Sequence, residues 1–121
     1  MRTALVVEDT QTERQIFTSC LERAGLNVLT ANSTEEALEK ISASKPDLIV
    51  LDVVLPGRSG FELCRELKAD PETSKIPVVM CSTKNSDMDK FWGMKQGADA
   101  YIAKPVDQEE LLRTVNQLIK N

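Results

Sequence analysis

The chain has 121 residues, of which 41% are hydrophobic and 28% charged, and these values fit one globular domain over residues 1–121. A net charge of −4 argues against nucleic-acid binding, and the absence of histidine excludes Ser-His and Cys-His catalysis. The chain has no signal-peptide pattern and no apolar run near the ~20 residues of a membrane span, so we expect a cytoplasmic protein without membrane insertion.

Short apolar runs alternate with amphipathic stretches five times along the chain. Three of the runs are continuous and rich in β-branched residues, which is typical of strands buried on both faces of a parallel sheet. The alternation predicts an α/β fold, namely a (βα)₅ doubly wound parallel five-stranded sheet with the flavodoxin-like order 2-1-3-4-5. The predicted strands contain residues 4–7, 28–29, 48–51, 78–81 and 101–103.

Start and stop signals mark the predicted helices. Three Ser or Asp residues precede a Glu by three positions, which is the spacing of a capping box, and two glycines stand where helices should end. The three cysteines lack paired spacing, so we expect buried thiols rather than disulfides or a metal site. The capping pairs are Ser33–Glu36, Ser59–Glu62 and Asp107–Glu110, the glycines are Gly25 and Gly97, and the cysteines are Cys20, Cys64 and Cys81.

Ionisable or hydroxyl side chains follow four of the five predicted strands. The first strand ends in Glu8 and Asp9, and the third ends in Asp52. Ser82 ends the fourth strand, and Lys104 follows the fifth. In an open α/β sheet, ligands bind outside the carboxyl ends of the strands, at the point where the strand order reverses. We therefore expect these side chains to form one site.

Three carboxylates in one place repel one another, and a hard divalent cation relieves this repulsion. We expect Mg²⁺, with Mn²⁺ as a substitute, and we expect Lys104 to bring the local charge close to neutral. Such a site suits a phosphoryl group, which a carboxylate attacks while the metal and the lysine stabilise its charge. Asp52 is the expected nucleophile because it ends the most central strand, and the Ser82 hydroxyl is expected to donate to a phosphoryl oxygen.

Together these features resemble the receiver domain of response regulators, the CheY-like superfamily, over essentially the whole chain. Each matching stretch is weak alone, but their order and spacing together are specific. Glu8 stands where many receivers have Asp, and Ser82 stands where Thr is also common. The matching stretches are Val6–Asp9, Asp52–Gly57 with Gly60, Met80–Thr83 and Gly97–Pro105.

The resemblance implies a role for each residue of the acidic site. Asp52 is expected to be the phosphoacceptor. Glu8 and Asp9 are expected to hold Mg²⁺, together with Asp52 itself and the backbone carbonyl of Val54. Lys104 is expected to pair with the phosphoryl group.

The resemblance also implies a switch. Ser82 is expected to be the switch hydroxyl, and Tyr101 the switch aromatic that turns inward when Ser82 moves toward the phosphate. The Lys104–Pro105 peptide bond is expected to be cis, a conformation confined almost wholly to X-Pro bonds.

Two positions are expected to tune the lifetime of the phosphorylated state. In receivers, the residue two after the acceptor and the residue two after the switch hydroxyl line the path of the hydrolytic water. Here these residues are Val54 and Lys84. Valine cannot hydrogen-bond that water, so we expect slow self-dephosphorylation.

Met88, Phe91 and Trp92 form an apolar patch on the predicted fourth helix. The favoured interpretation is that this patch packs against the sheet. The alternative is a partner surface made from the fourth helix, the fifth strand with Tyr101, and the fifth helix, and an exposed Trp92 would support it.

The predicted function is that of a single-domain response regulator. It accepts a phosphoryl group from a sensor histidine kinase, switches its binding to a downstream protein, and catalyses only its own phosphorylation and dephosphorylation. Residues 92–98 resemble PilH-like receivers of twitching-motility chemosensory systems, which implies a chemotaxis-type kinase. No output domain follows Asn121, so direct transcription control is not expected. We expect a monomer, with a phosphorylation-linked dimer as an alternative.

Three other functions fit parts of the pattern. A phosphorelay intermediate, which passes the phosphoryl group to a histidine phosphotransfer protein, would use the same residues. A metal-dependent phosphatase with an aspartyl nucleophile usually needs a second Asp two residues after the first. Val54 stands there, which argues against this function. A flavodoxin-like carrier needs a Ser-, Thr- and Gly-rich loop after the first strand, whereas residues 10–13 contain no glycine and follow two acids.

Overall fold

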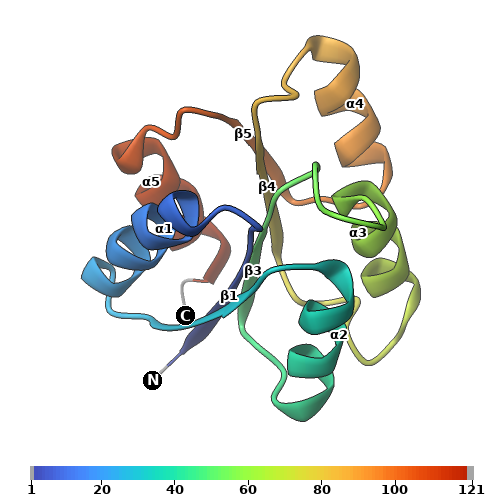
Figure 1. Cartoon of the computed structure of the whole chain (residues 1–121), viewed down its shortest axis with the longest axis horizontal. Coiled ribbons are helices and arrows are strands. Elements are labelled where there is room, and N and C mark those ends of the chain that lie inside the picture. The colour runs from blue at the N-terminus through green and yellow to red at the C-terminus, as the bar shows by residue number, and fades with distance from the viewer. Residues whose placement is uncertain (1, 120–121) are drawn as a thin grey trace.

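The computed structural model describes residues 2–119, and these residues form five strands and five helices in alternation, as predicted (Figure 1). The predicted domain also includes residues 1, 120 and 121, which lie outside the described residues. The strands are β1 (Thr3–Val7), β2 (Asn27–Ala31), β3 (Leu48–Leu51), β4 (Val78–Ser82) and β5 (Ala100–Ala103). The helices are α1 (Gln11–Arg23), α2 (Thr34–Ala43), α3 (Gly60–Ala69), α4 (Asp87–Lys95) and α5 (Gln108–Ile119).

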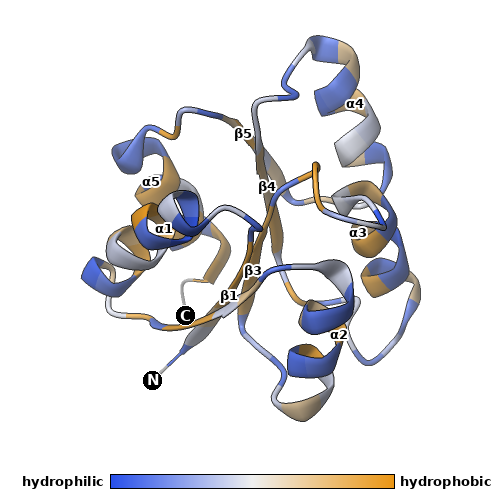
Figure 2. Ribbon diagram, viewed as in Figure 1, coloured by the Kyte–Doolittle hydropathy of each residue, from blue (hydrophilic) through white to orange (hydrophobic). Residues whose placement is uncertain are grey.

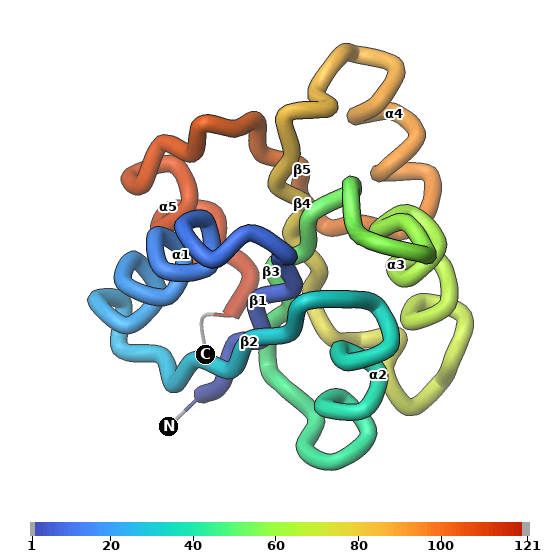
Figure 3. Tube along the Cα trace, in the orientation of Figure 1, coloured from blue at the N-terminus to red at the C-terminus, as the bar shows by residue number. Residues whose placement is uncertain are grey.

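The strands form one parallel sheet in the order β2-β1-β3-β4-β5, which confirms the predicted topology (Figure 3). β2 pairs with β1 residue for residue, from Thr3 opposite Asn27 to Val7 opposite Ala31. It is longer than predicted, because the polar Asn27 and Thr30 interrupt its apolar pattern at the edge of the sheet. β1 lies between β2 and β3, so the strand order reverses next to β1.

Helices cover both faces of the sheet and enclose two hydrophobic clusters. α1 and α5 lie on one face, and α2, α3 and α4 lie on the other (Figure 1). Alternate strand residues supply the two clusters: Leu5 and Val7 point to the α2–α3 side, and Ala4 and Val6 point to the α1–α5 side. The central strands are accordingly the most hydrophobic part of the ribbon in Figure 2.

Local signals place the helix ends where the sequence predicted them. Ser59 and Glu62 form a complete capping box at the start of α3, because each side chain accepts a hydrogen bond from the backbone N–H of the other. The Ser33 side chain likewise accepts from the Glu36 N–H at the start of α2. Further signals of this kind are the Ser86–Asp89 capping box of α4, the Asp107 side chain at the start of α5, and the left-handed glycines Gly25 and Gly97.

All three cysteines are free and buried, as predicted. Burial raises the pKa of the Cys64 thiol to about 11, so this thiol stays protonated at neutral pH. None of the helices within residues 2–119 combines the length and the hydrophobicity needed to cross a membrane.

The apolar side chains of α4 are exposed, so the prediction that they pack against the sheet is wrong. Met88, Phe91 and Trp92 are 73%, 59% and 47% exposed, and we call these three residues the α4 patch. α4 approaches the sheet through Gly93 instead, where a β-carbon would lie 2.7 Å from the ring of Tyr101. Helical geometry turns the α4 patch away from that contact.

Gly60, the first residue of α3, lies against the backbone at the end of β3. A β-carbon at Gly60 would lie 2.1 Å from the Asp52 carbonyl oxygen. Gly60→Ala is therefore expected to lower the free energy of unfolding by about 2–3 kcal/mol, because the backbone must move to admit a methyl group. Urea unfolding measures this loss.

The matched control is Gly25→Ala. Gly25 has φ 87° but no neighbour within 4 Å of a β-carbon, so its substitution should cost only about 1 kcal/mol of backbone strain. Equal losses in the two variants would contradict the close backbone packing at Gly60.

Candidate functional site

Three carboxylates meet at the carboxyl ends of β1 and β3. One oxygen from each of Glu8, Asp9 and Asp52 lies within 4.8 Å of the other two. These residues border an open cleft of about 550 Å³. The cleft is lined by Glu8, Asp9, Thr10, Glu13, Asp52, Val54, Thr83, Lys104 and Pro105.

The sheet places two of these carboxylates side by side. β1 pairs with β3 as far as Val7, so the residues that follow, Glu8 and Asp52, leave neighbouring strands at the same level. The Asp52 N–H donates to the Val7 carbonyl (3.1 Å), and the Glu8 N–H donates to the Ala31 carbonyl (2.9 Å). Glu8 and Asp52 are buried, whereas Asp9 lies exposed at the rim.

Lys104 closes the site from the end of β5. Its ammonium lies 2.6 Å from Glu8 Oε2 and 3.0 Å from Asp52 Oδ2, and its side chain is 7% exposed. The Lys104 N–H donates to the Ser82 carbonyl (3.0 Å), which anchors the residue to the end of β4. The Lys104–Pro105 peptide bond is cis. One cation thus bridges carboxylates from two neighbouring strands and offsets part of their repulsion.

Burial and pairing shift the ionisation of the site. Burial raises the pKa of Glu8 to about 7, although the hydrogen bond from Lys104 acts in the opposite direction. Burial lowers the pKa of Lys104, but hydrogen bonds to Glu8 and Asp52 outweigh burial and raise that pKa above its usual value. Lys104 therefore stays charged. The oxygen-only ligand set and the short separations among the carboxylates fit Mg²⁺, which favours ionised carboxylates.

The loop after β3 folds back onto Asp52. The Val54 N–H donates to Asp52 Oδ1 (3.2 Å), and the Gly60 N–H donates to the Val53 carbonyl (2.8 Å). The Val54 side chain is 58% exposed and forms part of the cleft wall. Because this side chain has no polar atom, it offers no hydrogen bond to a water molecule in the cleft.

The Ser82 hydroxyl and the Tyr101 ring are connected through the backbone of Lys84. Ser82 is fully buried, and its Oγ accepts a hydrogen bond from the Lys84 N–H (3.1 Å). The Tyr101 hydroxyl donates to the Lys84 carbonyl, and the half-buried ring lies against Gly93. Burial, followed by the negative charge of Asp89, raises the pKa of Tyr101 to about 12. The Lys84 ammonium pairs with Asp89 (2.9 Å) and does not line the cleft.

Glu13 and Thr83 line the cleft but were not predicted from the sequence. Glu13 follows Thr10 by three residues, a spacing that is typical of a local helix cap. Its Oε1 instead lies 3.4 Å from the Lys104 ammonium. Thr83 directly follows Ser82, and the alternation of side chains along a strand could have indicated that one of this pair faces the cleft.

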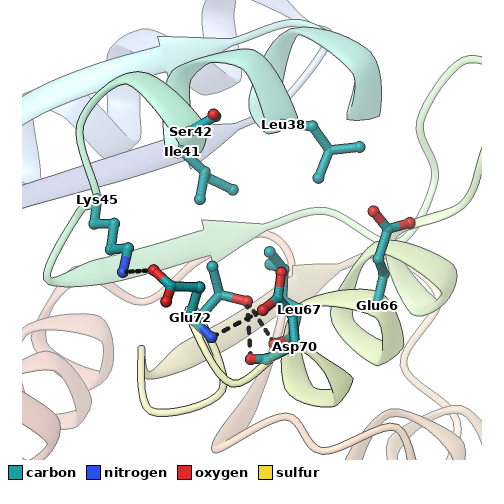
Figure 4. Close-up of a pocket in the computed structure, with 9 residues that line it drawn as sticks. Leu38, Ile41, Ser42, Lys45, Glu66, Leu67, Asp70 and Glu72 are labelled. Atoms are coloured by element: carbon teal, nitrogen blue, oxygen red, sulfur yellow. Dashed lines mark hydrogen bonds and ion pairs between the residues drawn. The ribbon is translucent and has the colours of Figure 1, made fainter.

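A second pocket, of about 280 Å³, lies between the C-terminal ends of α2 and α3 (Figure 4). Leu38, Ile41 and Leu67 supply its apolar lining. The Lys45 ammonium and the Glu72 carboxylate pair at its rim, 2.6 Å apart. Within residues 2–119, the metal-ligating cluster belongs to the carboxylate site and not to this pocket.

Fold and site together define a class of protein: a doubly wound α/β domain with an acidic cluster, closed by a lysine, at the point where the strand order reverses. The sequence profile of the response regulator receiver domain matches residues 4–116. The chain is 42% identical to the protein PilH of Pseudomonas aeruginosa over 119 residues, and this aligned region covers 98% of each protein. The chain belongs to the response regulator receiver family, and the predicted resemblance is confirmed.

Solved structures agree with this assignment. The chemotaxis protein CheY4 of Vibrio cholerae superposes with a TM-score of 0.91 at 32% identity, covering 98% of this chain and 99% of that one. A two-component response regulator from Clostridium difficile superposes with a TM-score of 0.92 at 26% identity, covering 100% of this chain and 98% of that one. The chain therefore has the general role of a receiver in two-component signalling.

The raised pKa of Glu8 predicts that the metal-free protein loses stability as the pH rises. The Glu8 carboxyl group ionises near pH 4.5 in the unfolded chain, whereas in the folded protein it keeps its proton up to about pH 7. The folded state binds more protons between these values, so the free energy of unfolding should fall by at most about 1.4 kcal/mol per pH unit. Urea unfolding with EDTA at several pH values measures the slope. In Glu8→Gln the slope should shrink, and an unchanged slope would refute the assignment.

Proposed function

We propose that residues 1–121 act as a single-domain response regulator that takes a phosphoryl group from a sensor histidine kinase onto Asp52 and then changes its binding to a downstream protein. The position of Asp52 carries this proposal. Its carboxylate lies 3.0 Å from the Lys104 ammonium and within 4.8 Å of oxygens from Glu8 and Asp9. Membership of the receiver family supports the signalling role.

In this proposal Glu8, Asp9 and Asp52 hold Mg²⁺, with the backbone carbonyl of Val54 as a further ligand. The bound metal would supply positive charge that stabilises the transferring phosphoryl group. Mn²⁺ also accepts carboxylate and carbonyl oxygens, so it is the proposed substitute. The contribution of the chain is to hold the carboxylate oxygens within reach of one ion and to keep Lys104 beside them.

The proposed reaction is a transfer from a phosphohistidine. A carboxylate oxygen of Asp52 attacks phosphorus, so an O–P bond forms while the N–P bond of the kinase histidine breaks and its electron pair leaves with that nitrogen. Lys104 donates to a phosphoryl oxygen, and its raised pKa keeps it protonated throughout. Ser82 supplies a second donor once its hydroxyl moves toward the phosphoryl group.

Ser82, Lys84 and Tyr101 form the proposed route from the phosphorylation site to the surface. The Ser82 and Tyr101 hydroxyls contact the N–H and the carbonyl of Lys84, respectively. Movement of Ser82 toward the phosphoryl group would break the first contact and displace the segment that also holds Tyr101. The α4 patch follows this segment and is exposed, which supports its role as the partner surface.

Similarity to named receivers supports a pathway of the chemotaxis or type IV pilus motility type. The observations are the 42% identity to PilH and the structural similarity to the chemotaxis protein CheY4. A chemotaxis-type histidine kinase is the proposed phosphodonor. The net charge of −4 favours a protein target over nucleic acid, and a monomer is the proposed resting form.

Incubation with Mg²⁺ and acetyl phosphate tests the phosphoacceptor. The mass of the intact protein should rise by one phosphoryl group, and Asp52→Asn should abolish the rise because the nucleophilic oxygen is lost. Asp87→Asn, which changes an exposed acid on α4, is the matched control and should still be labelled. Labelling of Asp52→Asn at the native level would refute the assignment of Asp52.

The lifetime of the phosphorylated state tests the role of Val54. Val54→Asn should shorten it by about three- to tenfold, because an amide can hydrogen-bond the attacking water and one hydrogen bond contributes about 0.5–1.5 kcal/mol. Decay of the labelled protein after removal of acetyl phosphate measures the lifetime. Val54→Ala is the control, because it widens the access of water to Asp52 without adding a hydrogen-bonding group. If alanine accelerates decay as much as asparagine does, the hydrogen-bonding explanation is wrong.

A further inference from the structure

Glu13 lines the cleft and extends its carboxylate toward Lys104. Its Oε1 is 3.4 Å from the Lys104 ammonium, and its side chain is 33% exposed. Glu13 is the third residue of α1, a position from which Glu often caps its own helix. The N-cap residue Thr10 makes no side-chain cap hydrogen bond, and the Glu13 carboxylate turns toward the end of β5 instead.

Phe17 makes a second contact between α1 and Lys104, beneath the cleft. Phe17 lies one turn after Glu13 on the same face of α1, and its ring is buried. The Lys104 ammonium lies 5.8 Å from the centroid of that ring. One face of α1 therefore contacts the lysine through both a charge and an aromatic ring, beside the two carboxylates that the lysine already bridges.

Glu13 changes the charge balance of the proposed metal-loaded site. Glu8, Asp9 and Asp52 together with Mg²⁺ and Lys104 would sum to a neutral cluster. Glu13 adds one negative charge beside Lys104, within the open cleft that a phosphodonor would enter. Phosphodonors are anions, so this charge opposes their approach, and the carboxylate also competes with the phosphoryl group for the ammonium.

We propose that Glu13 is a positioning residue for Lys104 with two opposite effects, an inference that rests on the proposed function. Glu13 helps Mg²⁺ to bind, because it retains Lys104 when the metal takes Glu8 and Asp52. It restrains phosphorylation of Asp52, because it repels the donor and holds the lysine. The resting protein is thereby kept metal-ready but slow to react with small phosphodonors.

Glu13→Gln separates the two effects, because it removes the charge and keeps the shape. At saturating Mg²⁺ and low salt, labelling by acetyl phosphate should become about fivefold faster. This gain should shrink at ~1 M salt, where the Debye length is about 3 Å and charges farther apart are screened. The affinity for Mg²⁺ should weaken by about threefold. It is measured without any phosphodonor, from the NMR shifts of the backbone amides of the ¹⁵N-enriched protein as Mg²⁺ is added.

Glu22→Gln is the control, because it removes an exposed charge from the opposite end of α1 and should leave both quantities at the native values. A loss of both Mg²⁺ affinity and labelling rate in Glu13→Gln would indicate a merely structural role and overturn the inference. Unchanged values would overturn it as well, while normal labelling of the native protein would leave the proposed function intact. If the native protein is not labelled on Asp52, the proposed function fails and the inference fails with it.

Discussion

The pairing of one buried lysine with carboxylates from two neighbouring strands is the constraint on which the site depends. The topology forces the ends of β1 and β3 together, so Glu8 and Asp52 meet whether or not their charges favour it. Lys104 reaches them from β5, and Phe17 of α1 covers it. Desolvation offsets much of the Coulomb attraction in such a cluster, so folding stability alone does not explain its presence. The proposed binding of a cation and a phosphoryl group does explain it.

Two glycines set how closely α3 and α4 pack against the sheet. At Gly60, α3 contacts the carbonyl of Asp52 so closely that a methyl group has no space, and the loop that carries Val54 is held in place. At Gly93, α4 rests on the ring of Tyr101 and buries little else. A helix with few buried side chains separates from the fold at low cost. The α3 side of the sheet is therefore held closely at Asp52, whereas α4 is held to the sheet by few contacts.

Much of the fold could be predicted, because strands buried on both faces leave continuous apolar runs in the sequence. The bounds of β2 were less clear, because Asn27 and Thr30 break the pattern of an edge strand. The carboxylates and Lys104 could be brought together because parallel strands end at one edge. The direction of the α4 patch could not be predicted, because helical spacing shows which residues share a face but not what that face contacts. The signal that decides it is the missing side chain of Gly93.

The segment between β4 and α4 joins the site to the α4 patch through Lys84. Ser82 and Tyr101 hold the two sides of the Lys84 backbone, while the Lys84 ammonium pairs with Asp89. Asp89 also accepts hydrogen bonds from Ser86 in the capping box that starts α4. The Lys84 N–H donates to the Ser82 hydroxyl while the Lys84 carbonyl accepts from the Tyr101 hydroxyl, so both predicted switch residues contact the backbone of one residue in this segment. In the proposed switch, displacement of Lys84 would therefore move Tyr101 and the start of α4 together.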